Sequence, residues 1–344
     1  MAIFGFALAH AHQRLDTLLG CGKPITLFYH GVDNDGAYGK AVLSHYLTTH
    51  FSDVEFRAVG INYGQPIKPE DVEGRAVIFV DYSPTTQEDV ALIMTKAEEY
   101  MIIDHHRTSL QKFLNHANEM DLMFYQKAND HLFFDFENSG ALLAERICFP
   151  EKKVSGIIRY VHDRDLFAKK LPLNDEVHLL LNAKRIVGEE DEIYRDFHHL
   201  NTQAFLKEIA KEGIDMGELK NIHDERIAQL TRKFTVAKYM YGQPYQEHMV
   251  AVINNTDHSL TSDLAASILA EHEEIDMVAI ITKIDFAKSL YHVGLRSREV
   301  DVSEVAMSLD ARGEGGGHPR ASGCRVHIRR FSAEFNAIGV YPNE

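Results

Sequence analysis

The sequence predicts a two-domain α/β protein, with a parallel sheet covered by helices in the first part of the chain and a smaller α/β domain at the end. Two observations favour this fold class. The chain has 344 residues, which is enough for two domains with separate hydrophobic cores. Along its first half, short apolar runs alternate with helical patterns, and this rhythm is typical of βαβ units, which build parallel sheets.

The elements of the first half can be placed from these runs. The short apolar run 3–9 has no Lys or Arg before it, unlike the apolar run of a signal peptide. We therefore expect an N-terminal helix that ends near Gly20. Strands are expected at 25–29, 54–59, 76–80 and 100–103. Helices are expected at about 37–50, 84–99, 139–148 and 154–161.

The remainder of the chain predicts a connector and a second domain. Residues 190–236 are charged and helical in pattern and show no strand signal. Beyond them, strands are expected at 249–253, 277–281 and 289–295, helices at 262–272 and 303–309, and a Gly-rich loop at 313–317. We therefore expect one domain at 1–188, a helical connector at 189–240 and a second domain at 241–344.

Composition and charge exclude several classes of protein. The hydrophobic content of 45% is ordinary for a globular chain, and no apolar run is long enough to span a bilayer. The formal net charge of −15 argues against long duplex nucleic acid as a partner. The three cysteines lie far apart without a CxxC pair, which argues against a disulfide framework and against a structural zinc site. We expect a cytoplasmic protein with no membrane partner.

Asp and His residues follow several of the predicted strands directly. In an open parallel sheet the carboxyl ends of the strands meet at one edge, where ligands bind. Residues more than 130 positions apart in the sequence are therefore expected to share one cleft. They are His30, Asp33, Asp35, Asp81, Asp104, His105, His106, Asp163 and Asp165.

Such a cluster favours divalent metal chemistry. Neighbouring carboxylates repel one another unless protons or cations lie between them, and mixed Asp and His ligands suit manganese, iron, zinc or cobalt. Two metals about 3.5–4 Å apart can activate water and stabilise a leaving oxygen in phosphoryl displacement. Each part also has a structural interpretation, since an Asp-x-Asp-Gly loop is often a simple turn and an Asp after a strand is often a helix cap. The combination favours hydrolysis of a phosphate ester or anhydride.

Five motifs, in order, resemble those of the DHH phosphoesterase superfamily, which includes RecJ exonucleases, family II pyrophosphatases, exopolyphosphatases and nanoRNases. The naming motif is matched by Ile102-Ile103-Asp104-His105-His106-Arg107. The others are matched by the segments 30–36, 80–83, 160–163 and 315–323. Many members place three residues between the first His and Asp, whereas two separate His30 from Asp33 here.

The resemblance implies a DHH catalytic domain and a DHH-associated substrate-binding domain, with the active site in the cleft between them. It implies two Mn²⁺ ions per site, with Mg²⁺ or Co²⁺ as possible substitutes. One ion would be held by His30, Asp33 and Asp81. The other would be held by Asp35, Asp81, His105 and Asp163, with Asp163 preferred to Asp165 because a Tyr-Val-His pattern precedes it.

Other roles follow from the same resemblance. His106 would hydrogen-bond to the phosphate or protonate the leaving group, and Asp104 would orient the two histidines. Arg107 would contact a substrate phosphate or pair with a surface acid. The second domain would bind substrate through Arg296, Ser297, Gly315, Gly316, Gly317 and His318.

We expect a nanoRNase-like exonuclease, an Mn²⁺-dependent oligoribonuclease that hydrolyses short oligonucleotides. The alternatives within the enzyme class are an exopolyphosphatase or pyrophosphatase, a cyclic-dinucleotide phosphodiesterase and a 3′-phosphoadenosine 5′-phosphate phosphatase. A catalytically silent nucleotide-binding regulatory protein is the alternative outside it. Expected partners are short oligonucleotides or other small phosphorylated substrates. A homodimer is left open.

Overall fold

The computed structural model describes residues 7–121, 124, 128–212, 215–242 and 245–341. The chain divides into two compact units, Met1–Lys220 and Asn221–Glu344. The predicted fold class is confirmed, because one unit is built on a parallel sheet and the other on a second, mixed sheet. No helix within the described ranges is both long and apolar enough to cross a membrane.

The first unit is built on a five-stranded parallel sheet. The strand order is β2-β1-β3-β4-β5, so the order reverses between β1 and β3, with β2 on one side and β3 to β5 on the other. The short strand β5 was not predicted from the sequence. The strands are β1 (Ile25–His30), β2 (Phe56–Ile61), β3 (Ala76–Val80), β4 (Glu99–Asp104) and β5 (Leu132–Phe134).

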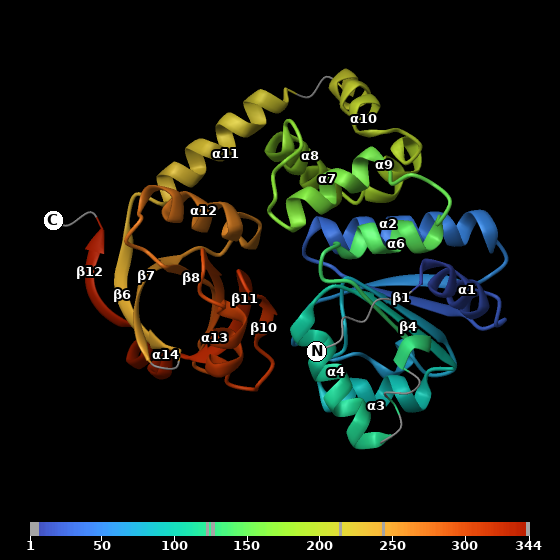
Figure 1. Ribbon diagram of the computed structural model, residues 1–344, viewed down its shortest axis with the longest axis horizontal. Coiled ribbons are helices and arrows are strands. Elements are labelled where there is room, and N and C mark those ends of the chain that lie inside the picture. The colour runs from blue at the N-terminus through green and yellow to red at the C-terminus, as the bar shows by residue number, and fades with distance from the viewer. Residues whose placement is uncertain (1–6, 122–123, 125–127, 213–214, 243–244, 342–344) are drawn as a thin grey trace. The chain divides into compact units, whose positions relative to one another are not determined.

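Helices cover both faces of this sheet, with α2 and α6 on one side and α3 and α4 on the other (Figure 1). Alternate strand residues enter the two cores, as Leu27 and Ile78 do on one face and Phe28 and Phe79 on the other. The α-helices are α1 (Leu8–Leu19), α2 (Asn34–His50), α3 (Gln87–Lys96), α4 (Arg107–Met120), α6 (Gly140–Cys148), α7 (Gly156–Asp165), α8 (Asn174–Ile186), α9 (Glu190–Phe197) and α10 (Thr202–Ile209). Short 3₁₀ turns are η1 (Pro69–Asp71), η2 (Ala128–Asp130) and η3 (Ala210–Glu212).

Helices α9 and α10, which the sequence assigns to a connector, pack into the first unit. The side chains of Tyr194 and Phe205 are fully buried in the core that also contains α2 and α6. The buried ammonium group of Lys40 on α2 lies 2.8 Å from a carboxylate oxygen of Glu190 on α9. Apart from Glu190, the charged residues of α9 lie on its outer face, as in an amphipathic helix. Helix α11 (Met216–Leu230) then leads into the second unit.

The second unit is built on a seven-stranded sheet with the order β10-β11-β9-β8-β7-β6-β12. Strands β7 and β8 are parallel, and the other neighbours are antiparallel. The strands are β6 (Phe234–Tyr241), β7 (Gln246–Asn254), β8 (Met277–Asp285), β9 (Leu290–Ser297), β10 (Gly316–His318), β11 (Ala321–His327) and β12 (Asn336–Tyr341). The helices are η4 (His258–Leu260), α12 (Thr261–Glu271), α13 (Val302–Leu309) and α14 (Ile328–Glu334).

Candidate metal centre

The sheet of the first unit positions an Asp/His cluster at the point where its strand order reverses. His30 is the last residue of β1, Asp81 directly follows β3, and Asp104 is the last residue of β4. Ligands of open α/β sheets bind at such a point, outside the carboxyl ends of the strands. The predicted convergence of these three strand ends is what the structure shows.

The first part of the cluster contains His30, Asp33 and Asp81. The Nδ1 atom of His30 lies 2.6 Å from Oδ2 of Asp33 and 3.6 Å from Oδ2 of Asp81. Burial alone would lower the pKa of His30, but the nearby charge of Asp33 raises it well above its usual value. Burial would raise the pKa of Asp33, yet the charge of His30 holds it well below its usual range. The shortened spacing of the first motif therefore still brings His30 into the cluster.

The second part of the cluster surrounds His105. Its Nε2 atom lies 3.1 Å from Oδ1 of Asp81, 3.6 Å from Oδ2 of Asp165 and 3.7 Å from Oδ2 of Asp35. Asp81 is common to both parts, because one carboxylate oxygen faces His105 and the other faces His30. Asp81 has a left-handed backbone with φ of 55°, an uncommon conformation for residues with a side chain that Asp tolerates better than most.

The structure departs from the sequence prediction at Asp163. Its carboxylate accepts hydrogen bonds from the backbone N–H groups of Lys170 and Leu171 and from the amide of Asn174, at 2.7–3.0 Å. Asp165 takes its place beside His105. The two residues lie two positions apart near the end of α7, where side chains point about 200° away from each other. Asp163 therefore anchors the loop after the helix.

Asp35 is oriented by the start of α6, a contact that the sequence did not reveal. Its carboxylate oxygens accept hydrogen bonds from the N–H groups of Gly140 and Ala141, at 2.5 and 3.0 Å. The positive end of the helix dipole stabilises the carboxylate there. A Cβ atom on Gly140 would lie 2.6 Å from Cβ and 2.9 Å from Cα of Asp81. Only glycine at this position allows Asp35 and Asp81 to approach each other.

Replacing this glycine gives a first prediction. Gly140→Ala is expected to lower the free energy of unfolding by about 1–3 kcal/mol, because backbone near Asp81 must move. It is also expected to lower turnover on the order of a hundredfold, because the carboxylates are displaced from each other. Thermal unfolding and steady-state kinetics measure the two effects. Gly217→Ala, at an exposed position of α11, is the matched control. It should lower neither the free energy of unfolding nor the turnover. Wild-type behaviour of Gly140→Ala would contradict the described packing.

Asp104 contacts the ring of His106 through a short hydrogen bond. The Nδ1 atom of His106 lies 2.7 Å from Oδ1 of Asp104, whose other oxygen accepts a hydrogen bond from the hydroxyl of Ser83. The backbone N–H of His105 donates to the same Oδ1. Burial would raise the pKa of Asp104, but the charge and hydrogen bond of His106 lower it to about 2. Asp104 is therefore an anion that fixes the tautomer and orientation of the His106 ring.

Arg107 lies at the start of α4 with an exposed side chain. Its guanidinium group is 5.1 Å from the centre of the Phe136 ring, a cation–π contact. The side chain of Arg107 therefore lies on the surface. In the sequence, Arg107 directly follows His106 of the cluster. Its role in binding substrate remains a prediction.

The carboxylates of the cluster destabilise one another. Burial raises the pKa of Asp81 well above its usual value, and the charges of Asp35 and Asp33 raise it further. Burial and the charge of Asp35 also raise the pKa of Asp165. Divalent cations would relieve this repulsion, and the mixture of carboxylate oxygens with imidazole nitrogens suits manganese, iron, zinc or cobalt. The residues present therefore fit a divalent metal centre.

These shifts predict how stability depends on pH and metal. Because the pKa values of Asp81 and Asp165 are raised by folding, their protonated forms stabilise the metal-free protein at low pH. This contribution is lost as the pH rises from about 4 through the raised pKa values. Metal binding displaces these protons, so the stabilisation by Mn²⁺ should increase with pH. At a free concentration a hundred times Kd it should reach about 2.7 kcal/mol.

Thermal unfolding in excess EDTA and in excess Mn²⁺, at several pH values between about 5 and 8, measures this effect. The gap between the two curves should widen toward the alkaline end. A gap that is constant or widest at acid pH would show that these carboxylates do not exchange protons for the metal.

The second unit brings most of its predicted substrate-binding residues onto adjacent strands. Arg296 on β9 pairs in register with Ala321 on β11, and β11 pairs with the Gly-rich strand β10, which contains Gly316, Gly317 and His318. Gly317 has φ of 138°, and a Cβ there would lie 2.6 Å from the carbonyl oxygen of Ala321. A Cβ on Gly315 would overlap the carbonyl of Ala306. Both glycines are therefore required by the backbone.

Arg296 is a cation without a carboxylate partner among the described residues. Its Nε and Nη2 atoms each lie 3.2 Å from the hydroxyl oxygen of Ser262, and Nη1 donates to the carbonyl of Leu295. Burial lowers its pKa to about 10. A half-buried guanidinium with such neutral partners is suited to bind an anion. The hydroxyl of Ser297, in contrast, donates to the carbonyl of Val300 and serves the turn after β9.

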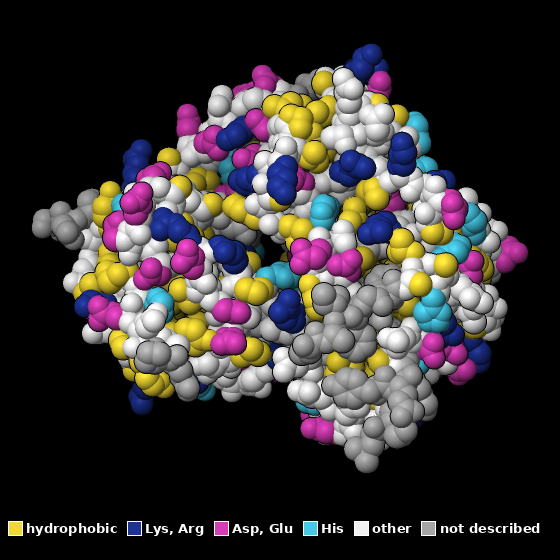
Figure 2. Space-filling view, in the orientation of Figure 1, with side chains coloured by type: hydrophobic (Ala, Val, Ile, Leu, Met, Phe, Trp, Pro, Cys, Tyr) yellow, Lys and Arg dark blue, Asp and Glu magenta, His cyan; other side chains and the backbone are white. Residues whose placement is uncertain are grey.

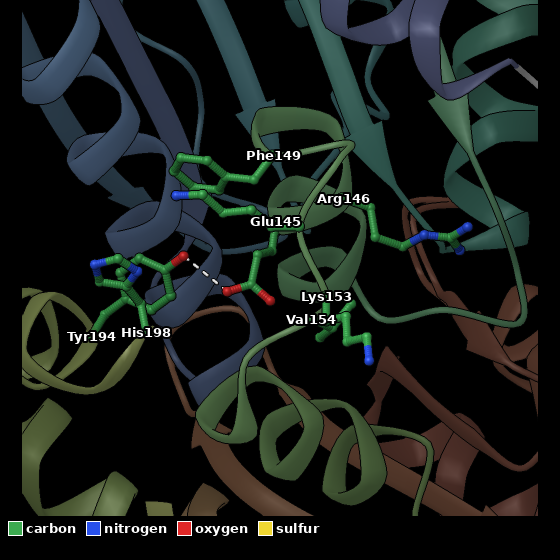
Figure 3. A pocket seen from close by; sticks show the side chains of 8 residues that line it. Glu145, Arg146, Phe149, Lys153, Val154, Tyr194 and His198 are labelled. Carbon is green, nitrogen blue, oxygen red and sulfur yellow. Dashed lines mark hydrogen bonds between the residues drawn. The ribbon is translucent and has the colours of Figure 1, made fainter. Parts of the chain in front are cut away.

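A pocket elsewhere in the first unit does not resemble an active site. It is lined by residues of α6, the segment after it and α9 (Figure 3). The hydroxyl of Tyr194 donates to Glu145 at 2.9 Å, so both polar groups are satisfied within the chain. Figure 3 shows Arg146 and Lys153 directed away from this pair. The pocket shares no residue with the Asp/His cluster.

The fold and the arrangement of the Asp/His cluster resemble those of the DHH superfamily. Residues 246–338 match the DHHA1 domain family. RecJ from Thermus thermophilus, solved in complex with Mn²⁺, has the same fold with a TM-score of 0.53 and 16% identity, and the match covers 95% of this chain and 53% of RecJ. The chain thus spans about half the length of that protein. The resemblance to the DHH superfamily is thereby confirmed.

Two further solved structures are similar over most of their length. An exopolyphosphatase-related protein from Bacteroides fragilis is 12% identical, with 97% of both chains covered and a TM-score of 0.46. An uncharacterized protein from Helicobacter pylori is 14% identical, with 88% of this chain and 93% of that chain covered and a TM-score of 0.35. No curated protein sequence matches the chain.

Proposed function

We propose that the protein is an Mn²⁺-dependent phosphoesterase that hydrolyses phosphodiester bonds of short oligonucleotides, dinucleotides included. The observation that carries this proposal is the placement of Asp81, whose two carboxylate oxygens face His30 and His105. A carboxylate in this position is suited to bridge two metal ions. Asp33 would supply a further oxygen ligand beside His30. Asp35 and Asp165 would supply oxygen ligands beside His105.

The chain's own residues support this chemistry. Two bound ions would supply an activated water and stabilise the leaving oxygen. His106 would donate a hydrogen bond or a proton to the leaving oxygen, because Asp104 fixes its ring through Nδ1. Asp104 itself stays ionised at neutral pH, since its pKa is about 2. It would therefore keep the Nδ1 side of the His106 ring turned toward Asp104.

Charge favours a short anionic substrate over a long one. The formal net charge is −15, and Figure 2 shows Lys and Arg side chains interspersed with Asp, Glu and His on the face in view. Long single strands are bound along extended positive grooves with stacked aromatic side chains. Arg296 and the backbone of the Gly-rich strand β10 would instead bind a terminal phosphate of a short substrate. This would limit the length of substrate that is cleaved efficiently.

Product analysis tests the proposal. The Mn²⁺-loaded protein is incubated with 5′-labelled RNA and DNA oligomers from the dimer to about a 24-mer, and with polyphosphate and pyrophosphate in parallel. We expect mononucleotides from the shortest oligomers and slower release from longer ones. Phosphate release from inorganic chains alone would assign the site to polyphosphate or pyrophosphate hydrolysis. Metal binding without turnover of any of these substrates, cyclic dinucleotides and 3′-phosphoadenosine 5′-phosphate would favour a regulatory protein.

Arg296 gives a further prediction on substrate binding. Arg296→Gln removes the cation, so KM for a dinucleotide is expected to rise about tenfold or more, with a smaller change in kcat. Steady-state kinetics over a range of dinucleotide concentrations separate the two constants. Arg298→Gln is the matched control, because the guanidinium of Arg298 donates to backbone carbonyl groups at the end of α12 and just before β8. An unchanged KM for Arg296→Gln would remove this residue from the substrate site.

A further inference from the structure

We infer that Asn62 is a positioning residue that fixes the ring of His30 and selects Nδ1 as its metal-binding atom. Asn62 follows β2, the strand that pairs with β1, and His30 lies opposite Ile61 in that register. The inference rests on the metal-dependent function proposed above, and it adds the residue that orients one ligand. Neither the motif pattern nor the charge of the sequence pointed to Asn62.

The hydrogen bonds of Asn62 determine which way its amide faces. Its Oδ1 atom accepts the backbone N–H of Tyr63 at 2.8 Å and lies 3.2 Å from Nε2 of His30. If the amide were turned over, its NH₂ group would face the N–H of Tyr63, and two donors would oppose each other. Oδ1 is therefore the atom that faces His30. The ring must donate to it through an Nε2–H group.

This contact determines the state of the other ring nitrogen. A neutral imidazole has one N–H group, so an Nε2–H leaves a lone pair on Nδ1. That Nδ1 atom is buried, and it lies 2.6 Å from a carboxylate oxygen of Asp33 and 3.6 Å from one of Asp81. A lone pair so close to carboxylate oxygens needs a proton or a metal cation between them, and a bound metal ion would take the place of the proton. The cluster thus presents one nitrogen and two oxygens toward a common position.

The loop that carries Asn62 is held in place by its own contacts. The N–H of Asn62 donates to the side-chain oxygen of Gln65, and the N–H of Gln65 donates back to the carbonyl of Asn62, at 2.9 and 3.0 Å. The ring of Tyr63 lies 5.7 Å from that of His30 and 6.0 Å from that of His106, centre to centre. Its hydroxyl lies 3.0 Å from the hydroxyl oxygen of Ser109 on α4. Asn62 is therefore a fixed acceptor beside His30.

Calorimetric titration with Mn²⁺ tests the inference without reference to activity. Asn62→Ala removes the acceptor, and it is expected to weaken binding of one Mn²⁺ by about 10–100-fold. Asn62→Asp keeps an oxygen for both the Tyr63 N–H and His30, so it should bind Mn²⁺ at least as tightly as the wild type. Asn118→Ala is the matched control, since Asn118 on α4 donates to a helix carbonyl. It should leave both affinities unchanged.

Thermal unfolding separates orientation from folding. In EDTA, Asn62→Ala and Asn62→Asp should unfold at similar temperatures. On addition of Mn²⁺, only Asn62→Asp should show as large an increase in unfolding temperature as the wild type. Wild-type Mn²⁺ affinity in Asn62→Ala, or equal weakening in both variants, would overturn the inference. A wild-type protein that binds no Mn²⁺ would overturn it as well. A wild-type protein that binds Mn²⁺ but cleaves no oligonucleotide would refute the proposed function alone.

Discussion

Asp81→Asn is expected to lower kcat on a dinucleotide on the order of a thousandfold or more, and to reduce the number of tightly bound Mn²⁺ ions. The reason is geometric, since the two oxygens of one carboxylate face His30 and His105. An amide leaves one neutral oxygen for two cations. Single-turnover kinetics and calorimetric titration with Mn²⁺ measure the two effects.

Asn is the most informative replacement at this position. It has nearly the same shape as Asp, and Asn and Asp tolerate the left-handed backbone that Asp81 adopts better than other residues with a side chain. The folded structure should therefore be retained. Asp89→Asn is the control for loss of a buried carboxylate outside the cluster, because Asp89 accepts the backbone N–H of Ile67. Near-normal turnover of Asp81→Asn would remove Asp81 from the centre of the reaction.

The second large effect is expected at Asp165, and it distinguishes this residue from Asp163, which lies two positions before it. Asp165→Asn is expected to lower activity on the order of a hundredfold and to weaken Mn²⁺ binding, with the metal-free protein as stable as the wild type or more so. The gain in stability would come from removing a charge that Asp35 and burial destabilise. Kinetics, metal titration and thermal unfolding in EDTA measure these properties.

Asp163→Asn is expected to show the reverse behaviour. An amide cannot accept from Lys170, Leu171 and Asn174 together, so the free energy of unfolding should fall by about 2–3 kcal/mol. The following loop contains Phe167 with φ of 52°, a strained backbone that these hydrogen bonds help to hold. Folded Asp163→Asn should still bind Mn²⁺. The opposite result would be a folded Asp163→Asn that loses Mn²⁺ binding and an Asp165→Asn that keeps it. That result would restore Asp163 as the metal ligand, as assigned from the sequence.

The parallel sheet and most of its cluster could be predicted from the sequence, because apolar strands such as 76–80 are followed at once by Asp or His. Strand ends in a parallel sheet meet at one edge, so residues such as His30, Asp81 and His105 converge whatever their separation in the chain. Asp163 and Asp165 differ from this case. Both lie at the end of a helix, and the hydrogen bonds of the next loop, which leave no sequence pattern, decide which one faces the sheet.

Residues that orient the cluster were also beyond prediction. Gly140 at the start of α6 and Asn62 after β2 act through single contacts with Asp35 and His30, and neither residue type is unusual at a helix start or in a loop. Strand β12 was missed because most of its residues are exposed, so it shows no alternation of buried and exposed positions. Helix α9 was assigned to a connector because its charged residues outnumber Ile193 and Tyr194, which it buries.

The central proposal is that one Asp/His cluster would hold two metal ions, with Asp81 as a ligand of both. Anomalous diffraction from crystals soaked in Mn²⁺ tests it most directly. We predict two peaks about 3.5–4 Å apart, one next to His30 and Asp33 and the other next to Asp35, His105 and Asp165, with Asp81 in contact with both. A single peak that Asp81 does not contact, or a peak beside Asp163, would contradict the account.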